Sequence, residues 1–188
     1  MLKKLMLTLI GGLFIMTSSN ADATDSNIIN MEVSSGGTIA IKLMPDIAPK
    51  HVARIKKLAN EGFYDGIIFH RVIENFMAQT GDPTGTGTSG SKYPDLPAEF
   101  SNYTFKRGTV GMARTMNPDS ANSQFFICFT DYKCRGLTGS YTVVGQVEDG
   151  MEFVDKLAVG EPPSNPDKII KMTVASNEEA PEPKKAAE

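Results

Sequence analysis

The sequence predicts a mainly β protein, a closed or nearly closed antiparallel β structure capped by two α-helices. Most of the chain reads as short strand segments, while one helical segment lies near the start and one near the end. The order does not alternate strand, helix, strand, which argues against a parallel sheet that binds nucleotides. With 188 residues, 40% hydrophobic and 22% charged, the chain suits one globular domain.

The first half of the chain supplies three strand segments and the longer helix. Residues 36–44, "GGTIAIKLM", alternate apolar and polar side chains, as a half-buried strand does. The next segment has apolar residues at helical spacing from Pro49 onward, and Gly62 marks its end. Two β-rich runs follow at 66–73 and 76–82. A proline-containing loop is expected over 89–97.

The second half repeats the pattern with a shorter helix. Strand-like runs cover 107–114, 123–130 and 141–147. Residues 150–157, "GMEFVDKL", place apolar side chains on one helical face. The segment 168–176 alternates again and predicts the last strand.

Both ends of the sequence are expected to lie outside the folded domain. Lys3 and Lys4 precede the apolar run 5–16, and "ADA" at 21–23 matches a signal peptidase site. A membrane-spanning helix needs about 20 apolar residues, so this run favours a cleaved signal over an anchor. Residues 1–23 therefore predict export, most simply to the periplasm. The tail 177–188 is charged and rich in proline and alanine, which predicts disorder.

Charge and cysteine content narrow the function classes. The formal net charge is −3 and the sequence has no cluster of basic residues, so nucleic acid is not an expected partner. No stable membrane insertion is expected of the mature chain. Cys128 and Cys134 could form a disulfide in an exported protein, whereas Cys128 also reads as a buried free cysteine in a strand. The sequence leaves both alternatives open.

The stretch 85–92, "GTGTSGSK", has the G-x-G-x-x-G spacing of a dinucleotide-binding turn, but its context contradicts that function. Such a turn must connect a strand to a helix. Pro83 interrupts a strand before it, and two prolines in "SKYPDLP" prevent a helix after it. The preferred interpretation is a tight surface loop with several glycines at positive φ.

The two histidines, His51 and His70, do not suggest metal or hydrolase chemistry. A metal site needs three or four closely spaced ligands, and none is visible. No serine lies in a G-x-S-x-G turn beside a histidine. Neither a metal nor a cofactor is expected.

One group of residues does suggest a site. In "FHRVIENFMAQTGD", Phe69, Arg71 and Ile73 should share one strand face. Met77 and Gln79 should share a face of the following strand. In "SQFFIC", alternate residues should place Gln124, Phe126 and Cys128 together. If these strands adjoin, an arginine lies beside apolar side chains and two glutamines.

These motifs give a specific resemblance. "FHRVIENFMAQTGD", "GMAR" followed by "NSQFFIC", and "VVGQVEDGMEFVDKL" resemble the cyclophilin-type peptidyl-prolyl cis–trans isomerases, most closely the exported bacterial members. The likeness covers about residues 28–176. It implies a closed eight-stranded antiparallel barrel with two capping helices, and an isomerase (rotamase) that assists protein folding.

The resemblance also implies site residues. Arg71 corresponds to the catalytic arginine, and no cofactor is involved. The implied substrate-binding residues are His70, Ile73, Phe76, Met77, Gln79, Ala113, Arg114, Thr115, Gln124, Phe126, Leu137 and Tyr141. The implied partners of this expected monomer are proline-containing peptides and unfolded or newly exported proteins.

The sequence departs from the common family pattern at three positions. Gly136 stands where many members have tryptophan, Tyr141 where many have histidine, and Arg114 where asparagine is common. Since that tryptophan helps to hold cyclosporin, weak cyclosporin binding is expected. The alternative function is an exported chaperone module that binds proline peptides and catalyses only incidentally. Arg71 argues against it, because a simple binding module would not need the arginine.

Overall fold

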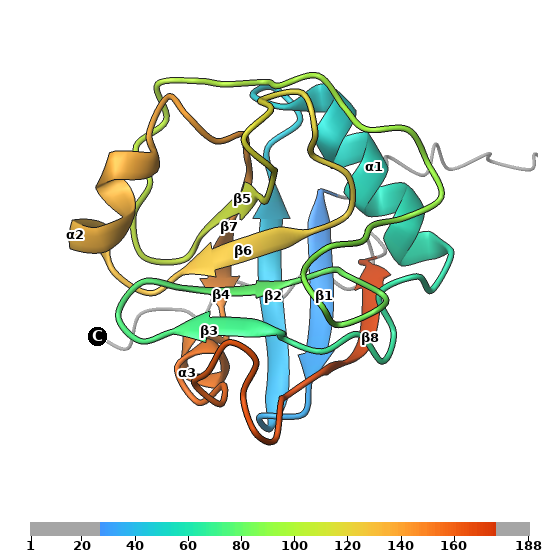
Figure 1. Ribbon diagram of the computed structural model, residues 1–188, viewed down its shortest axis with the longest axis vertical. Coiled ribbons are helices and arrows are strands. Elements are labelled where there is room, and N and C mark those ends of the chain that lie inside the picture. The colour runs from blue at the N-terminus through green and yellow to red at the C-terminus, as the bar shows by residue number, and fades with distance from the viewer. Residues whose placement is uncertain (1–26, 176–188) are drawn as a thin grey trace, which may run out of the picture.

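The computed structural model describes residues 27–175. The predicted signal segment 1–23 and the predicted disordered tail 177–188 lie outside the described residues. Eight strands form one sheet, with three short helices and one 3₁₀ turn around it (Figure 1). In chain order the elements are β1 (Ile28–Val33), β2 (Gly37–Leu43), α1 (Pro49–Asn60), β3 (Arg71–Ile73), β4 (Met77–Thr80), β5 (Thr109–Met112), β6 (Phe125–Cys128), α2 (Asp131–Cys134), η1 (Arg135–Leu137), β7 (Val143–Asp149), α3 (Met151–Val154) and β8 (Ile169–Val174).

The sheet is antiparallel throughout and has the strand order β3-β4-β6-β5-β7-β2-β1-β8. It is an open half-barrel, so the expectation of a closed barrel is wrong. The segment between α3 and β8 lies along the outer edge of β3. There Val72 and Gly160 exchange backbone hydrogen bonds of 2.8 and 2.9 Å. Only a few bonds, such as Phe69 N to Asp167 O at 2.8 Å, join the segments that precede β3 and β8.

Three expected elements differ from those observed. β1 was not predicted, although Ile29, Met31 and Val33 point inward in a regular alternation. The run 66–73 contributes only three residues of strand, and Phe69 lies in the main core rather than beside Arg71. The second capping helix is the single turn α3 instead of the whole segment 150–157.

The main core lies between the inner face of the sheet and α1. Val52, Ile55 and Leu58 of α1 are buried against strand residues such as Met31 and Ile127. Figure 1 shows α1 at one end of the sheet and α3 at the other. Because these apolar residues recur at helical spacing, they share one face of α1, and that face covers one end of the half-barrel.

A second apolar cluster lies on the opposite, outer face of the sheet near α2. Its buried members are Met77, Phe105, Phe126, Cys128, Cys134 and Val143. Cys128 and Cys134 form a disulfide with a Cα–Cα distance of 6.2 Å, which fits the usual range. The bond attaches α2 and the following η1 to β6. Of the two alternatives that the sequence left open, the structure has the disulfide.

The N-terminus of α1 is capped by a residue from a distant loop. Ala48 at the N-cap position offers no side-chain acceptor. Instead the Glu99 carboxylate accepts hydrogen bonds from the backbone N–H groups of Lys50 and His51, at 3.2 and 3.1 Å, and lies 2.6 Å from His51 Nδ1. A carboxylate is favourable here because the first N–H groups of a helix have no internal acceptor.

We predict that Glu99→Ala lowers the free energy of unfolding by about 1–3 kcal/mol, because it removes the cap and leaves the His51 ring buried without its partner. Urea denaturation measures the effect. Glu148→Ala is the matched control, since the Glu148–Lys42 pair is exposed and its atoms are 3.5 Å apart. Equal losses in the two variants would contradict the role of Glu99.

Candidate active site

The register of four strands brings the candidate residues into one row. Arg71 pairs with Gln79, Gln79 with Phe126, and Phe126 with Gly111. Because side chains alternate across a sheet, their neighbours Val72, Ala78 and Ile127 point to the other face and enter the main core. The row therefore lies on the outer face of the sheet.

Gly111 leaves room for the Phe126 ring in this row. A Cβ at Gly111 would lie 2.6 Å from Phe126 Cζ and 2.7 Å from Phe105 Cε1. The two rings stack with centroids 5.8 Å apart, and Tyr141 packs edge-on against Phe126 with centroids 5.7 Å apart. The glycine thus allows an aromatic side chain to lie flat across the strand.

An apolar pocket of about 220 Å³ opens beside the row. Its walls come from β3, β4 and β6, from the segment after β5, and from η1 and the loop that follows. Nine of the residues expected at the site line it: Arg71, Phe76, Met77, Gln79, Ala113, Arg114, Phe126, Leu137 and Tyr141. Elements far apart in the sequence thus converge on one pocket whose lining includes two cations, Arg71 and Arg114.

Glu161 fixes one edge of the Arg71 guanidinium. Arg71 Nε donates to Glu161 Oε2 at 2.9 Å, and Nη1 lies 3.9 Å from the Met77 sulfur. Because both side chains are partly exposed, the ion pair adds little stability. It does restrict the rotation of the guanidinium, so that the remaining N–H donors keep their direction at the pocket.

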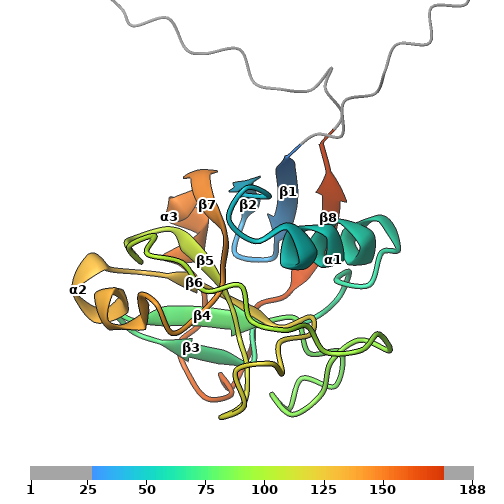
Figure 2. The same cartoon turned by 90° about the horizontal axis from the view of Figure 1, so that it is seen from above.

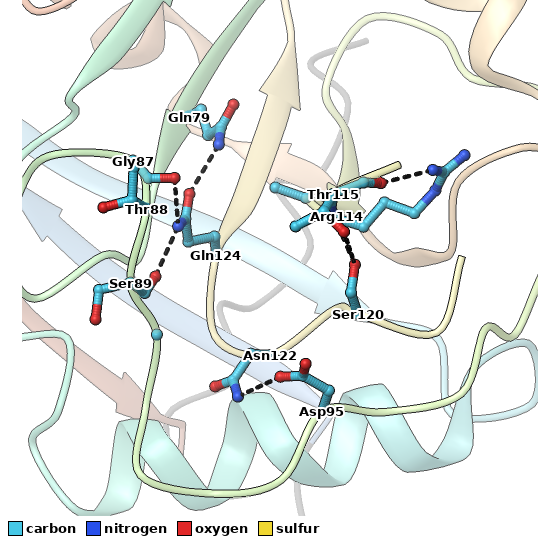
Figure 3. Close-up of a pocket in the computed structure, with 12 residues that line it drawn as sticks. Gln79, Gly87, Thr88, Ser89, Asp95, Arg114, Thr115, Ser120, Asn122 and Gln124 are labelled. Atoms are coloured by element: carbon cyan, nitrogen blue, oxygen red, sulfur yellow. Dashed lines mark hydrogen bonds between the residues drawn. The ribbon is translucent and has the colours of Figure 1, made fainter. Parts of the chain in front are cut away.

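A second, polar pocket of about 230 Å³ continues from the first (Figure 3). The two share Gln79, Ala113 and Arg114. The expected site residues Thr115 and Gln124 line the second pocket. Together the pockets form a groove, one half lined mainly by apolar side chains (the apolar pocket) and the other lined mainly by polar residues (the polar pocket).

A hydrogen-bond relay sets the side chains between the two halves. Gln79 Nε2 donates to Gln124 Oε1 at 2.8 Å, and Gln124 Nε2 donates to the carbonyls of Gly87 and Ser89 at 3.1 and 2.7 Å (Figure 3). The Gly-rich loop therefore fixes Gln124, which fixes Gln79. The relay begins at Gln79 on β4 and ends at the backbone carbonyls of Gly87 and Ser89. Because both ends are held by the backbone, the glutamine amides have a defined orientation.

The Gly-rich loop wraps around a carboxylate of the protein itself. Asp82 accepts hydrogen bonds from Thr84 N at 2.8 Å and from Ser89 N at 3.2 Å, as well as from threonine hydroxyls. Burial alone would raise the pKa of Asp82, but these hydrogen bonds outweigh it and lower the pKa. Gly85 and Gly87 have φ of 68° and 82°, as a tight loop requires. These N–H and hydroxyl groups of the loop therefore bind the Asp82 carboxylate of the protein itself.

Arg114 and Tyr141, two departures from the common family pattern, contact each other. The Arg114 guanidinium lies 4.6 Å from the Tyr141 ring centroid. It also donates to Ser140 O at 2.8 Å and to Thr115 O at 2.9 Å. Arg114 lines both halves of the groove and Tyr141 only the apolar half, so the contact holds Arg114 at the junction of the two halves.

His70 and Ile73 do not line either pocket, although both were expected near the substrate. His70 is buried beneath Gly87, and neither of its ring nitrogens has a hydrogen-bond partner. Burial lowers the pKa of His70, the Asp82 charge opposes this, and the Arg71 charge adds to it. Ile73 packs against the second apolar cluster. His70 therefore supports the Gly-rich loop from beneath, whereas Ile73 lies on the same face of β3 as Arg71.

Several residues of the groove were not predicted from the sequence. Glu161 is 90 positions from Arg71, and its turn gave no sign of an ion pair. Asp95, Ser120 and Asn122 line the polar pocket from loops. Only "NSQFF" gave a local signal, because Asn122 precedes a strand that already carried two site residues. At Gly136, where tryptophan is common in the family, a Cβ would meet no atom within 4 Å.

Within residues 27–175 no group of three or more His, Cys, Asp or Glu side chains is arranged to hold a metal ion. None of the helices in this part of the chain is long and apolar enough to cross a bilayer.

Comparison with known proteins identifies the class. Residues 28–174 match the family model of the cyclophilin type peptidyl-prolyl cis–trans isomerases. The chain therefore belongs to this family, whose members accelerate rotation about Xaa-Pro peptide bonds.

Named relatives and solved structures agree with this membership. A probable peptidyl-prolyl cis–trans isomerase of Brucella suis is 51% identical over 179 residues, covering 87% of this chain and 89% of that protein. Peptidyl-prolyl cis–trans isomerase B of Bacillus subtilis is 42% identical, covering 69% of this chain and 89% of the relative. A cyclophilin-type isomerase of Cryptosporidium parvum, whose structure was determined in the presence of the dipeptide Ala-Pro, is 27% identical with a TM-score of 0.73, over 80% and 99% of the two chains.

We predict that Gly111→Ala displaces the Phe126 ring and lowers kcat/KM for Xaa-Pro peptides about tenfold or more. The free energy of unfolding should fall by about 1–3 kcal/mol, as in other overpacked sites. Peptide isomerisation and urea denaturation measure the two effects. Gly136→Ala is the control, because its added Cβ meets nothing. Unchanged turnover in Gly111→Ala would show that the ring position does not matter.

We also predict that the protein loses stability as the pH falls below about 6.5, the usual histidine value. Burial lowers the pKa of His51, against the opposing effect of Glu99, and burial lowers that of His70. Because each folded-state pKa is lowered, the unfolded chain binds more protons, and stability present above 6.5 is lost as the pH falls through the folded values. Urea midpoints between pH 8 and pH 5 test this. A flat profile would contradict it.

Proposed function

We propose that this isomerase acts on newly exported, unfolded proteins in the periplasm, with Arg71 as the catalytic residue. The observation that supports the catalytic role is the cross-strand row, in which a guanidinium, a glutamine and a phenylalanine adjoin an apolar pocket. Export is supported by the sequence of residues 1–23. We propose that proline-containing segments are the substrates and that no cofactor takes part.

In this proposal the apolar pocket receives the proline ring. Phe76, Met77 and Phe126 would hold the ring, while Leu137 and Tyr141 form the opposite wall. A pocket of about 220 Å³ accommodates one proline ring with adjoining backbone. The polar half of the groove, with Thr115 and Gln124, would accept the polypeptide on one side of the bond. The proline is thereby fixed while the other side turns.

Arg71 would act on the transition state. Rotation about an Xaa-Pro bond faces a barrier of about 18–20 kcal/mol, because the twisted amide loses its conjugation. In the twisted amide the prolyl nitrogen becomes pyramidal and gains a lone pair, which can accept a hydrogen bond from a guanidinium N–H. The planar amide accepts such a bond poorly, so the interaction favours the transition state over the ground state.

The remaining residues would make this interaction stronger. Glu161 restricts the guanidinium, so less freedom is lost when the bond forms. Gln79 would orient the arginine or the substrate carbonyl through the relay to Gln124. A roughly 10⁵-fold acceleration requires about 7 kcal/mol, to which one charge-assisted hydrogen bond and positioning in a groove both contribute.

The open space at Gly136 supports weak cyclosporin binding. No side chain extends over this side of the pocket from Gly136. A large apolar ligand therefore gains less contact there than in members with tryptophan, whereas a small proline ring does not depend on this contact. We propose that the protein works as a monomer, since the whole groove is formed by one chain.

We predict that Arg71→Ala lowers kcat/KM for a short Xaa-Pro peptide about 10²–10³-fold while the protein stays folded. Arg71→Lys should restore little activity, because the ammonium lacks the fixed N–H donors of the guanidinium. Protease-coupled isomerisation of purified 24–188 measures the rates, and circular dichroism checks the fold.

Glu161→Gln separates positioning from catalysis. It should lower kcat several-fold with little change in KM, because Arg71 keeps its charge but gains freedom. If Arg71→Ala kept full turnover, the catalytic assignment would be wrong. If Arg71→Ala lost turnover but still suppressed aggregation of exported proteins as well as the parent, binding rather than catalysis would be the cellular function.

A further inference from the structure

Three cations gather around the ring of Tyr93, on the loop between the Gly-rich segment and Glu99. Arg54 lies 5.2 Å, Lys57 4.3 Å and Lys92 5.4 Å from the ring centroid. Arg54 and Lys57 come from one face of α1, and Lys92 comes from the loop. The ring face offsets part of their charge. Because the three residues are scattered in the sequence, no basic cluster was visible there.

Within residues 27–175 these cations form no ion pair with a carboxylate, and Arg54 donates instead to Pro94 O at 2.9 Å. Of the neighbouring acids, Glu61 accepts a hydrogen bond from the Tyr93 hydroxyl at 2.6 Å and keeps its negative charge beside the ring, Asp95 accepts from Asn122, and Glu99 caps α1. Three cations at the ring outnumber this one carboxylate, so the local charge is positive on a chain of net charge −3.

A groove adjoins these cations at Lys92 and Tyr93, which both line it. The apolar residues Leu58, Phe63 and Pro83 form its floor, and Glu61 also lines it. Arg54 and Lys57 lie beside the groove, over the Tyr93 ring. Gly90 lines both this groove and the polar pocket. The polar pocket in turn adjoins the apolar pocket. A polypeptide that leaves the apolar pocket through the polar half of the active groove is therefore led toward the Tyr93 cations.

We propose that Arg54, Lys57, Lys92 and Tyr93 form a secondary binding site for an acidic segment of the client polypeptide, beyond the residues that flank the proline. This inference rests on the proposed function, since it gives that groove a preferred class of substrate. A polypeptide is the favoured occupant because the site continues a peptide groove and is hollowed rather than flat. Carboxylates supply the missing opposite charges, while the apolar floor accepts the aliphatic parts of the segment.

The test compares peptides that differ only in distant charge. Each contains one Xaa-Pro bond, a Gly-Ser spacer of variable length, and either four glutamates or four glutamines at one end. Glutamates on one side of the proline should raise kcat/KM roughly five- to tenfold over glutamines at low salt. The preference should disappear at about 1 M salt, because the charges are exposed.

Charge-reversal variants locate the effect. In Lys57→Glu/Lys92→Glu the ratio of acidic to neutral peptide turnover should fall to one or below. Lys171→Glu carries a charge change of the same sign on β8 and should keep the parent ratio. Thermal unfolding checks that every variant is folded. An equal ratio for parent and double variant would overturn the proposal.

Failure of this inference is distinguishable from failure of the proposed function. A parent that isomerises short and long peptides alike, without charge preference, lacks the secondary site but remains an isomerase. If no peptide is turned over, fluorescence anisotropy with a labelled four-glutamate peptide lacking proline decides the binding site alone, and loss of binding in the double variant supports it. Binding to phosphatidylglycerol vesicles that the double variant loses, without any peptide preference, would assign the cations to a membrane surface and overturn the proposal.

Discussion

The pairing of β4 between β3 and β6 is the constraint on which the site depends. In an antiparallel sheet the register decides which side chains are neighbours, and a shift of one residue exchanges the two faces. Here Ala78 and Ile127 pack into the main core, so the register cannot slip without exposing them. The same register places Gln79 between Arg71 and Phe126. Burial of side chains on the inner face of the sheet thus determines which side chains are neighbours at the site on the outer face.

A second layer of constraints comes from loops that behave as rigid parts. Asp82 gathers N–H and hydroxyl donors of the Gly-rich loop, and the loop's carbonyls hold Gln124. On the opposite side, the Cys128–Cys134 bond attaches to β6 the segment that carries Leu137. Neither segment belongs to the sheet, yet each is attached at β6 or at the residue before it, one by the Gln124 hydrogen bonds and the other by the disulfide. The groove therefore has firm walls although loops form much of its surface.

The sequence predicted the features that depend on local pattern. Alternation in 123–130 correctly separated Phe126 and Cys128 from Phe125 and Ile127, and the apolar spacing in α1 correctly gave its buried face. It did not predict that the sheet stays open between β3 and β8, because no local pattern records whether two strands far apart in the sequence pair. The Glu161–Arg71 pair and the cations at Tyr93 were missed for the same reason. Closure of the sheet was expected from the order of the elements and from the resemblance, whereas these contacts were not expected at all.

The position of β1 beside β8 has a further consequence. Ala175 N donates to Ile28 O at 2.8 Å, so the two ends of the described part of the chain lie next to each other. Figure 2 shows β1 and β8 emerging together on the side away from β3 and β4. The described part of the chain therefore starts and ends at nearly the same place, on the side of the sheet away from β3 and β4. A protein of this topology can be fused to another domain, or recircularised and opened at a different loop, with the groove left facing the solvent.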